Sequence, residues 1–321
     1  MTEANVESKS RFACAADATY LVTGGLGSLG LHVAHWLVER GARHLVLASR
    51  RGLPERAEWA NVSKDTDAWR QIVAVQGLEA RGVDVQTIRA DATNRAGMAA
   101  VIDRIQASSR PLRGVVHAAG VVTERAIVDL DRSGIDQILD PKVAGGWNLH
   151  ELTQTIDLDF FLLFSSISSV WGSSELAHYA AGNQFLDSLA QYRRSHGLPG
   201  LAVNWGPWSG GGMASDALDR LAAMGVHALQ PDRAVAALGQ LVGSNRAQVA
   251  IASMDWAAFV PLFGSMRRRP LLARFERASG RPAATGSSDV MGRLLAAAPS
   301  DRVDRLAELI EAEVASVLGT E

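Results

Sequence analysis

The stretch TYLVTGGLGSLG, residues 19–30, joins an apolar run, a glycine-rich turn and the start of an amphipathic segment. Its first part is typical of a buried strand, and Gly25, Gly27 and Gly30 have the G-x-G-x-x-G spacing. Such glycines permit a tight turn and let the backbone approach a pyrophosphate, which then lies at the N-terminus of the following helix. A glycine-rich turn without a ligand is the alternative, but the order strand, turn and helix favours a dinucleotide site. The residues expected to contact the cofactor here are Thr23, Gly24, Gly25, Gly27, Ser28, Leu29 and Gly30.

Short apolar runs separated by helical segments continue along the chain. The expected strands are residues 19–24, 44–49, 83–91, 114–120, 160–166, 200–206 and 248–256. Most of these are continuous apolar runs, as expected for parallel strands that are buried on both faces. We therefore predict an α/β fold with a doubly wound, parallel, Rossmann-like sheet, followed by a linker and short C-terminal helices.

Changes in composition divide the chain into four expected parts. Residues 1–16 form a polar tail, 17–276 the Rossmann domain, 277–291 a linker rich in Gly, Ala, Ser and Pro, and 292–321 a C-terminal helical segment. In that last part, apolar residues recur every three or four positions over 303–317, which predicts an amphipathic helix.

Composition and charge exclude several function classes. The net charge of −2 gives no reason to expect nucleic acid or an anionic membrane as a partner. Cys14 is the only cysteine, so the chain has no disulfide framework, and the histidines have no metal-ligand spacing. The N-terminus lacks a signal sequence, and the longest apolar run, 160–164, is too short to cross a bilayer. We expect a cytoplasmic enzyme or scaffold without a metal.

The end of the second expected strand bears on the choice of dinucleotide. An NAD site usually has an acidic residue here for the ribose hydroxyls. This chain instead has Ser49, Arg50 and Arg51, with no acid before Pro54. Two guanidinium groups can pair with a 2′-phosphate, so NADPH is favoured; a solvated arginine pair is the alternative.

The third and fourth expected strands are followed by further candidate cofactor contacts. Asp91 and Ala92 follow the third strand, and Asp91 is placed to meet the adenine. Ala118, Ala119 and Gly120 are small enough to let the fourth strand line the cofactor.

Several motifs together resemble one superfamily. The stretches TGGLGSLG and HAAG, and a serine and a tyrosine thirteen residues apart (Ser166 and Tyr179), resemble the short-chain dehydrogenases/reductases. That superfamily commonly has Y-x-x-x-K, whereas position 183 here is Asn and a lysine stands at 142. This exchange resembles the ketoreductase domains of polyketide synthases, and the similarity extends over about residues 17–275.

The resemblance implies a reaction and roles for four residues. A hydride passes from NADPH to a β-keto carbon, and Tyr179 donates the proton that the oxygen receives. Ser166 bonds the same oxygen, Lys142 holds the nicotinamide ribose and favours ionisation of Tyr179, and Asn183 orients the lysine or a water. Tyr179 and Asn183 are four residues apart, so they share one helix face. Plain core packing of the tyrosine and the amide is the alternative.

The stretch after the sixth strand, NWGPWSGGGMA at 204–214, is expected to support the nicotinamide and lead into a lid. Pro207 stiffens the turn beneath the nicotinamide, and Gly210–Gly212 supply a hinge. The resemblance implies that Trp208 and Met213 face an acyl chain. An ordinary surface loop is the alternative.

Two features of the resemblance bear on stereochemistry. Ketoreductases that form the D-alcohol carry Leu-Asp-Asp after the fourth strand; here Val122, Thr123 and Glu124 take its place. Those that form the L-alcohol have a tryptophan eight residues before the tyrosine, where this chain has Trp171. An A-type, L-β-hydroxy product is therefore expected, unless Trp171 merely packs its loop. Leu176 is a further expected substrate contact.

The expected partners follow from the same resemblance. They are an acyl carrier protein that bears a phosphopantetheinyl β-ketoacyl chain, the N-terminal structural half of a ketoreductase, which is missing from this chain, and other synthase domains. The C-terminal helical segment, residues 292–321, resembles the start of such a carrier protein. Nucleic acid and membrane are not expected. A non-catalytic reductase-like domain and a free-standing ketone reductase are the alternative functions.

Overall fold

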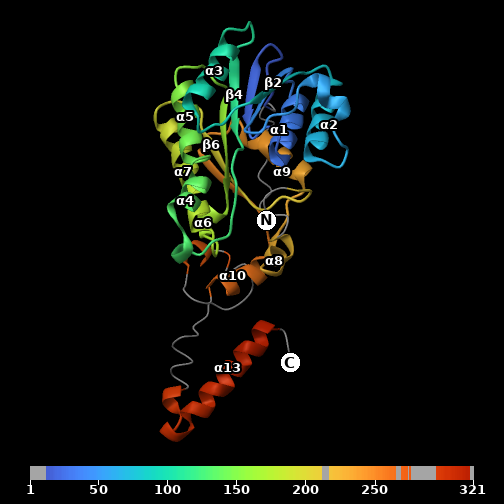
Figure 1. Cartoon of the computed structure of the whole chain (residues 1–321). Coiled ribbons are helices and arrows are strands. Elements are labelled where there is room, and N and C mark those ends of the chain that lie inside the picture. Colours follow the sequence, from blue (N-terminus) through green and yellow to red (C-terminus); the bar gives the residue numbers. More distant parts are fainter. Residues whose placement is uncertain (1–11, 212–216, 265–268, 274, 276–293, 319–321) are drawn as a thin grey trace. The chain divides into compact units, whose positions relative to one another are not determined.

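The computed structural model describes residues 12–211, 217–264, 269–273, 275 and 294–318, with side chains in the last helix as far as Glu311 (Figure 1). The chain forms two compact units, Met1–Met254 and Asp255–Glu321. No helix in these described ranges is both long and apolar enough to cross a membrane.

The first unit is built on a seven-stranded sheet with the order β3-β2-β1-β4-β5-β6-β8, in which all neighbouring strands are parallel. The strands are β1 (Thr19–Thr23), β2 (His44–Ser49), β3 (Asp84–Arg89), β4 (Leu112–His117), β5 (Phe160–Ser166), β6 (Leu201–Trp205) and β8 (Gln248–Ile251). A small antiparallel pair joins β7 (Val226–His227) to β9 (Ser253–Met254). The predicted doubly wound, Rossmann-like fold is confirmed.

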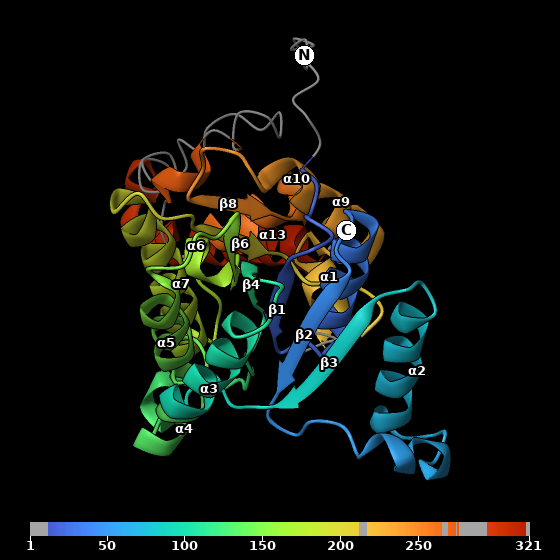
Figure 2. The same cartoon turned by 90° about the horizontal axis from the view of Figure 1, so that it is seen from above.

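Helices cover both faces of this sheet (Figure 2). One face packs against α1 (Ser28–Glu39), α2 (Asp67–Glu79) and α9 (Pro231–Leu241). The other packs against α3 (Arg95–Gln106), α5 (Val143–Thr153) and α7 (Ala177–Ser195). Shorter helices are η1 (Arg56–Asn61), η2 (Ile127–Asp129), α4 (Arg132–Leu139), α6 (Ser168–Trp171) and α8 (Leu218–Ala223).

Side-chain caps define where several helices begin. Thr66 accepts a hydrogen bond from the backbone N–H of Trp69 (3.2 Å) before α2. Asn94 accepts one from Gly97 (3.0 Å) before α3. Each cap satisfies a backbone donor that the helix itself leaves without a partner.

The segment before β1 is more structured than a polar tail. Phe12 stacks on Trp36 of α1, with ring centroids 6.0 Å apart, and it meets Phe160 edge-on. Cys14 is buried, and burial raises the pKa of its thiol to about 12. The described part of the expected tail therefore belongs to the core, because its apolar side chains cover the start of the sheet.

The second unit contains α10 (Trp256–Gly264), η4 (Pro270–Leu272), η5 (Pro299–Asp301) and α13 (Arg302–Leu318). Trp256 stacks on Phe275 with ring centroids 3.8 Å apart. Helix α13 matches the amphipathic helix predicted over 303–317. The expected boundaries at 276/277 and 291/292 lie outside the described residues.

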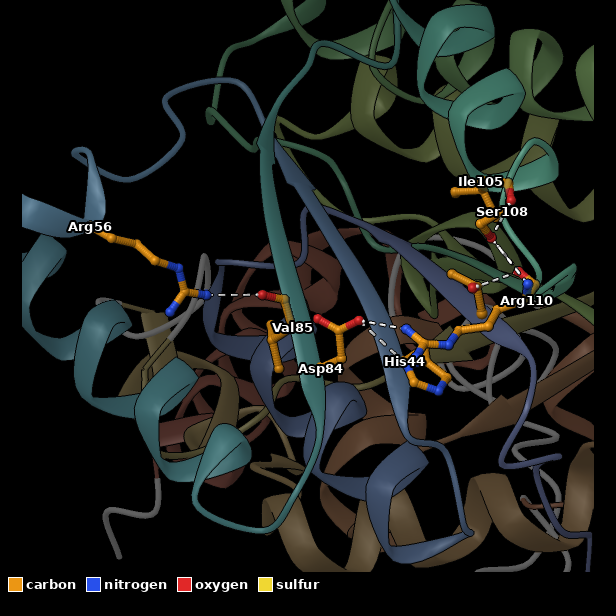
Figure 3. A network of polar contacts seen from close by, with 8 residues as sticks. His44, Arg56, Asp84, Val85, Ile105, Ser108 and Arg110 are labelled. Carbon is orange, nitrogen blue, oxygen red and sulfur yellow. Dashed lines mark hydrogen bonds and ion pairs between the residues drawn. The ribbon is translucent and has the colours of Figure 1, made fainter.

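The amino-terminal edge of the sheet is held by polar contacts (Figure 3). Asp84 accepts a hydrogen bond from Nη1 of Arg110 (2.9 Å), and its Oδ2 lies 3.5 Å from Nδ1 of His44. A cavity of about 120 Å³ lies beside them. Another of about 440 Å³ lies at the starts of β5 and β6. Neither is lined by the predicted site residues, which follow the opposite ends of the strands.

Candidate active site

The carboxyl ends of β1 and β4 form the switch point of the sheet, because the strand order runs outward in both directions from this pair. The turn after β1 lies directly against the turn after β4. Gly24 has φ +70°, and a Cβ atom there would lie 2.8 Å from the carbonyl of Ala118. A Cβ atom on Gly30 would lie 2.2 Å from the oxygen of Gly24. This packing requires glycine at both positions.

The N-terminus of α1 opens from this turn. Gly27 precedes the helix without a side-chain cap, and the first turn contains no acidic residue. Ser28 and Leu29 begin the helix and are partly buried. Backbone N–H groups and the helix dipole therefore favour an anion at this position.

Two arginines follow β2 at the same edge of the sheet. Arg50 and Arg51 are exposed and form no ion pair with any residue in the described ranges. Ser49 accepts a hydrogen bond from the backbone N–H of Gly52 (3.1 Å), which shapes the turn that carries them. Their positive charge is therefore available to a phosphate.

The loop after β3 is held by its own side chains and by α5. Asp91 accepts hydrogen bonds from the N–H and the hydroxyl of Thr93, both at 2.9 Å. Asn148 donates to the carbonyl of Ala92 at 2.9 Å. These contacts hold Asp91 and Ala92 at the carboxyl end of β3.

The side chain of Thr23, a predicted cofactor contact, is buried at the end of β1. Its Oγ1 lies 2.7 Å from Nδ1 of His117, so the predicted contact remains a prediction for the backbone of Thr23 alone. Nε2 of His117 lies 2.9 Å from the carbonyl oxygen of Pro141. Burial, with the nearby charge of Lys142, lowers the pKa of His117 to about 3, so the ring is neutral at physiological pH. A neutral ring with its proton on Nε2 donates to Pro141 and accepts from Thr23.

His117 therefore connects the end of β1 to the residue that precedes Lys142. The role of His117 was not predicted from the sequence, where HAAG drew attention to its small residues. The signal for it is a polar residue at the end of an otherwise apolar strand.

Lys142 extends from the start of α5 into the interior. Its side chain is only 2% exposed, and Nζ donates to the carbonyl of Phe164 on β5 at 3.2 Å. Space for it is provided by two glycines. A Cβ atom on Gly120 would lie 3.4 Å from Nζ, and one on Gly182 would lie 3.3 Å from Cδ. Burial lowers the pKa of Lys142 to about 8, and the charge of Asp187 opposes this shift.

Tyr179 lies next to that ammonium, and Ser166 and Asn183 interact with Tyr179. Nζ of Lys142 is 5.4 Å from the centre of the half-buried Tyr179 ring. Burial raises the pKa of the Tyr179 phenol, whereas the side chains of Asn183 and Ser166 act in the opposite direction. The Asn183 amide also donates to the backbone carbonyl of Tyr179 at 2.7 Å. The structure thus brings the four predicted catalytic residues together.

The segment between α6 and α7 borders this cluster. Glu175 has φ +58°, and its carbonyl accepts a hydrogen bond from the N–H of Arg125 at 2.8 Å. Trp171 ends α6 and Leu176 immediately precedes α7; both are partly exposed. Glu124, in the loop after β4, pairs with Arg220 of α8.

Trp208 lies elsewhere than predicted. It is 5% exposed and packs edge-on against Trp205, with ring centroids 5.0 Å apart, in the core. The expectation that it faces an acyl chain is therefore wrong, because the large indole is covered by the sheet and α1. Pro207 accepts a hydrogen bond from Leu229 at 2.7 Å and shapes the turn. Met213 lies outside the described residues.

A serine hydroxyl, a phenol and a buried ammonium beside a glycine turn are the arrangement of the short-chain dehydrogenase/reductase class. The family described as KR domain matches residues 18–210. The chain belongs to this family, the ketoreductases of polyketide synthases, whose activity is β-ketoacyl reduction.

Two polyketide synthases with similar sequences support this assignment. The chain is 40% identical over 305 residues to erythronolide synthase EryA3 of Saccharopolyspora erythraea. It is 38% identical over 309 residues to polyketide synthase GfsA of Streptomyces halstedii. Each match covers 94% of this chain but only 9% and 4%, respectively, of those proteins. The chain thus corresponds to a small part of each relative.

Solved structures of ketoreductases are also similar to this chain. A structure described as an A1-type ketoreductase has 37% identity and a TM-score of 0.76, covering 86% of this chain and 56% of that one. Another, of A-type ketoreductases from a modular polyketide synthase, has 38% identity and a TM-score of 0.74, covering 82% and 53%. A C2-type ketoreductase has 27% identity and a TM-score of 0.71. This chain spans about half the length of these proteins.

Proposed function

We propose that the chain reduces a β-ketoacyl thioester, carried on an acyl carrier protein, to the L-β-hydroxyacyl thioester with NADPH. The observation that carries the proposal is the convergence of Lys142, Ser166, Tyr179 and Asn183 beside the glycine turn. A second support is the similarity to ketoreductases described as A-type.

The residues present fit a dinucleotide phosphate. The close packing at Gly24 and Gly30 fixes the path of the turn, and the N-terminus of α1, which has no side-chain cap and no acidic residue in its first turn, would hold the pyrophosphate. The exposed guanidinium groups of Arg50 and Arg51 would pair with a 2′-phosphate. When bound, NADPH supplies the hydride.

Side chains of the protein donate the proton and stabilise the negative charge that develops on the carbonyl oxygen of the substrate. As the β-carbon is reduced, its oxygen gains negative charge, and the hydroxyl of Ser166 donates a hydrogen bond to it. The phenol of Tyr179 then gives its proton to that oxygen. Lys142, a buried cation 5.4 Å from the Tyr179 ring centre, stabilises the resulting phenolate. Asn183 holds the backbone of Tyr179 and thereby the direction of the phenol.

Incubation with an unsubstituted β-ketoacyl thioester and NADPH, followed by chiral analysis, tests the proposed function. We expect NADPH consumption and mainly the L-alcohol. If the product is mainly the D-alcohol, Trp171 does not direct the stereochemistry as predicted, but the assignment as a reductase stands. Binding of NADPH without turnover, on both carrier-bound and small ketones, would favour a non-catalytic domain. Comparable efficiency on both types of ketone would favour a free-standing reductase.

Arg50→Ala should raise the KM for NADPH at least about 10-fold and leave that for NADH nearly unchanged, because only NADPH carries the 2′-phosphate. Steady-state kinetics with both cofactors measures this. Arg246→Ala, which removes an exposed arginine beside the amino end of β8, is the matched control and should affect neither. Equal effects of Arg50→Ala on both cofactors would contradict the assignment.

A further inference from the structure

A buried polar cluster lies behind the four candidate catalytic residues. Asp187 of α7 is fully buried, and its Oδ2 lies 2.7 Å from Oγ of Ser169 and 2.8 Å from Nδ2 of Asn204. The Asn204 amide also donates to Oγ of Ser165 at 3.0 Å, at the end of β5. The Ser169 hydroxyl has one proton, which goes to the carboxylate as the stronger acceptor. Asp187 is thus fixed from α6 and β6 at once.

Lys142 enters the same region from the other side. Its Nζ bonds the carbonyl of Phe164, two residues before Ser166 on β5. Its Cδ lies against Gly182 on α7, five residues before Asp187, which is about 7.5 Å along a helix axis. The two charges therefore share a dry environment without forming a direct ion pair.

Charge balance connects the two groups. Within the described ranges, Asp187 is the only acidic residue in the buried set, and Lys142 and Arg193 are its only lysine and arginine. Arg193 is directed elsewhere: Nε donates to Pro199 at 2.7 Å, and Nη1 lies 3.1 Å from Nδ1 of His150. A buried charge is strongly disfavoured unless hydrogen bonds or a countercharge compensate it, and for Arg193 the compensation comes from these hydrogen bonds. Asp187 is left to balance Lys142.

We propose that Asp187 is a positioning residue whose carboxylate, held by Ser169 and Asn204, is the buried countercharge for the Lys142 ammonium. This inference rests on the proposed function, in which Lys142 acts as a cation toward Tyr179 and the cofactor ribose. Asp187 touches neither substrate nor cofactor and acts through Lys142. It thereby keeps Lys142 charged in the pH range in which the reductase works.

The direction of the pH effect follows from the groups that face Lys142. Burial lowers the pKa of Lys142 to about 8, and Asp187 opposes this shift. His117, on β4, is neutral because its pKa is lowered to about 3, and burial raises the pKa of Tyr179 on α7. Asp140, at the end of α4, is exposed and solvated. Removing the charge of Asp187 is therefore expected to lower the pKa of Lys142 further.

The chain offers a direct measurement, because Lys9, Lys64 and Lys142 are its only lysines. Replacing Lys9 and Lys64 by arginine in the full chain leaves one lysine, whose pKa is measured by NMR with ¹³Cε-labelled lysine. In that background, Asp187→Asn should lower the pKa of Lys142 by about one unit. The alkaline limb of the kcat profile should move in the same direction, which loss of packing alone would not cause.

Asp140→Asn is the matched control, since it removes a nearby but exposed carboxylate. An equal shift in this variant, or no shift in Asp187→Asn, would overturn the proposal. If the Asp187→Asn variant does not fold, the pKa of Lys142 in the protein that retains Asp187 still tests the proposal. A fully buried lysine without a countercharge has a pKa of about 5 to 6, so such a value for Lys142 would refute the proposal and a value near 8 would support it.

The NMR titration requires no turnover. The role of Asp187 as a countercharge and the proposed function can therefore be refuted independently of each other. If Asp187→Asn lowers the pKa of Lys142 in a protein that reduces no β-ketoacyl thioester, the proposed function is wrong and the pairing remains.

Discussion

Tyr179→Phe is expected to lower kcat for a β-ketoacyl thioester at least about 100-fold while NADPH still binds. The substitution removes one hydroxyl and keeps the ring that lies beside Nζ of Lys142. Because the phenol is the proposed proton donor, the loss should appear in kcat rather than in cofactor affinity. Stopped-flow turnover and NADPH fluorescence titration measure the two quantities.

Tyr192→Phe is the matched control for this experiment. Tyr192 lies on the same helix, but its side chain is 44% exposed and packs beside His196, away from Lys142. It should keep nearly full activity. Near-normal turnover by the Tyr179→Phe variant would remove Tyr179 from its assigned role.

Gly30→Ala should abolish NADPH binding at ordinary cofactor concentrations, with a rise in Kd of at least about 100-fold. A methyl group there would lie 2.2 Å from the carbonyl oxygen of Gly24, which is closer than Cβ atoms approach other atoms in real structures. Its nearest neighbours are backbone atoms of Gly24 and Gly25, which cannot rotate out of the way as a side chain can. The turn after β1 must therefore move, and the N-terminus of α1 moves with it. Calorimetric titration with NADPH measures the loss, and circular dichroism checks the fold.

Gly77→Ala provides the comparison within the same chain. Gly77 lies in α2, and a Cβ atom there would meet nothing within 4 Å. This variant should bind NADPH normally and gain about 0.5–1 kcal/mol in free energy of unfolding, because alanine loses less conformational entropy in a helix. If both glycine variants bind NADPH equally well, the turn after β1 is not the pyrophosphate site.

The sheet could be predicted because its signals are local. Apolar runs that are each followed by a helical segment, such as residues 160–166 and 44–49, match the strands Phe160–Ser166 and His44–Ser49 residue by residue. The strand order was not predicted, because general rules of parallel sheets allow more than one doubly wound order. Small differences remain at the ends, where β3 stops at Arg89 and residues 248–256 divide into β8, β9 and the start of α10.

The candidate site was only partly predictable. Tyr179 and Asn183 share a helix face by their spacing alone. Trp208 illustrates the limit: the resemblance implied that it faces an acyl chain, but Trp205 and Phe164 cover it. An isolated aromatic residue in a loop has no periodic neighbours that would reveal its burial.

The sequence by itself determined the parallel sheet, the glycine turn and the helix face of Tyr179 and Asn183, because backbone sterics and helical period act between near neighbours. Only the tertiary structure decided that Lys142 reaches Phe164, that His117 joins Thr23 to Pro141, and that Asp187 binds Asn204. These partners are separated by 17 to 94 residues in the chain. Their pairing depends on which buried polar groups are left facing each other once the sheet and helices pack, and a buried group must then bond whichever partner that packing supplies.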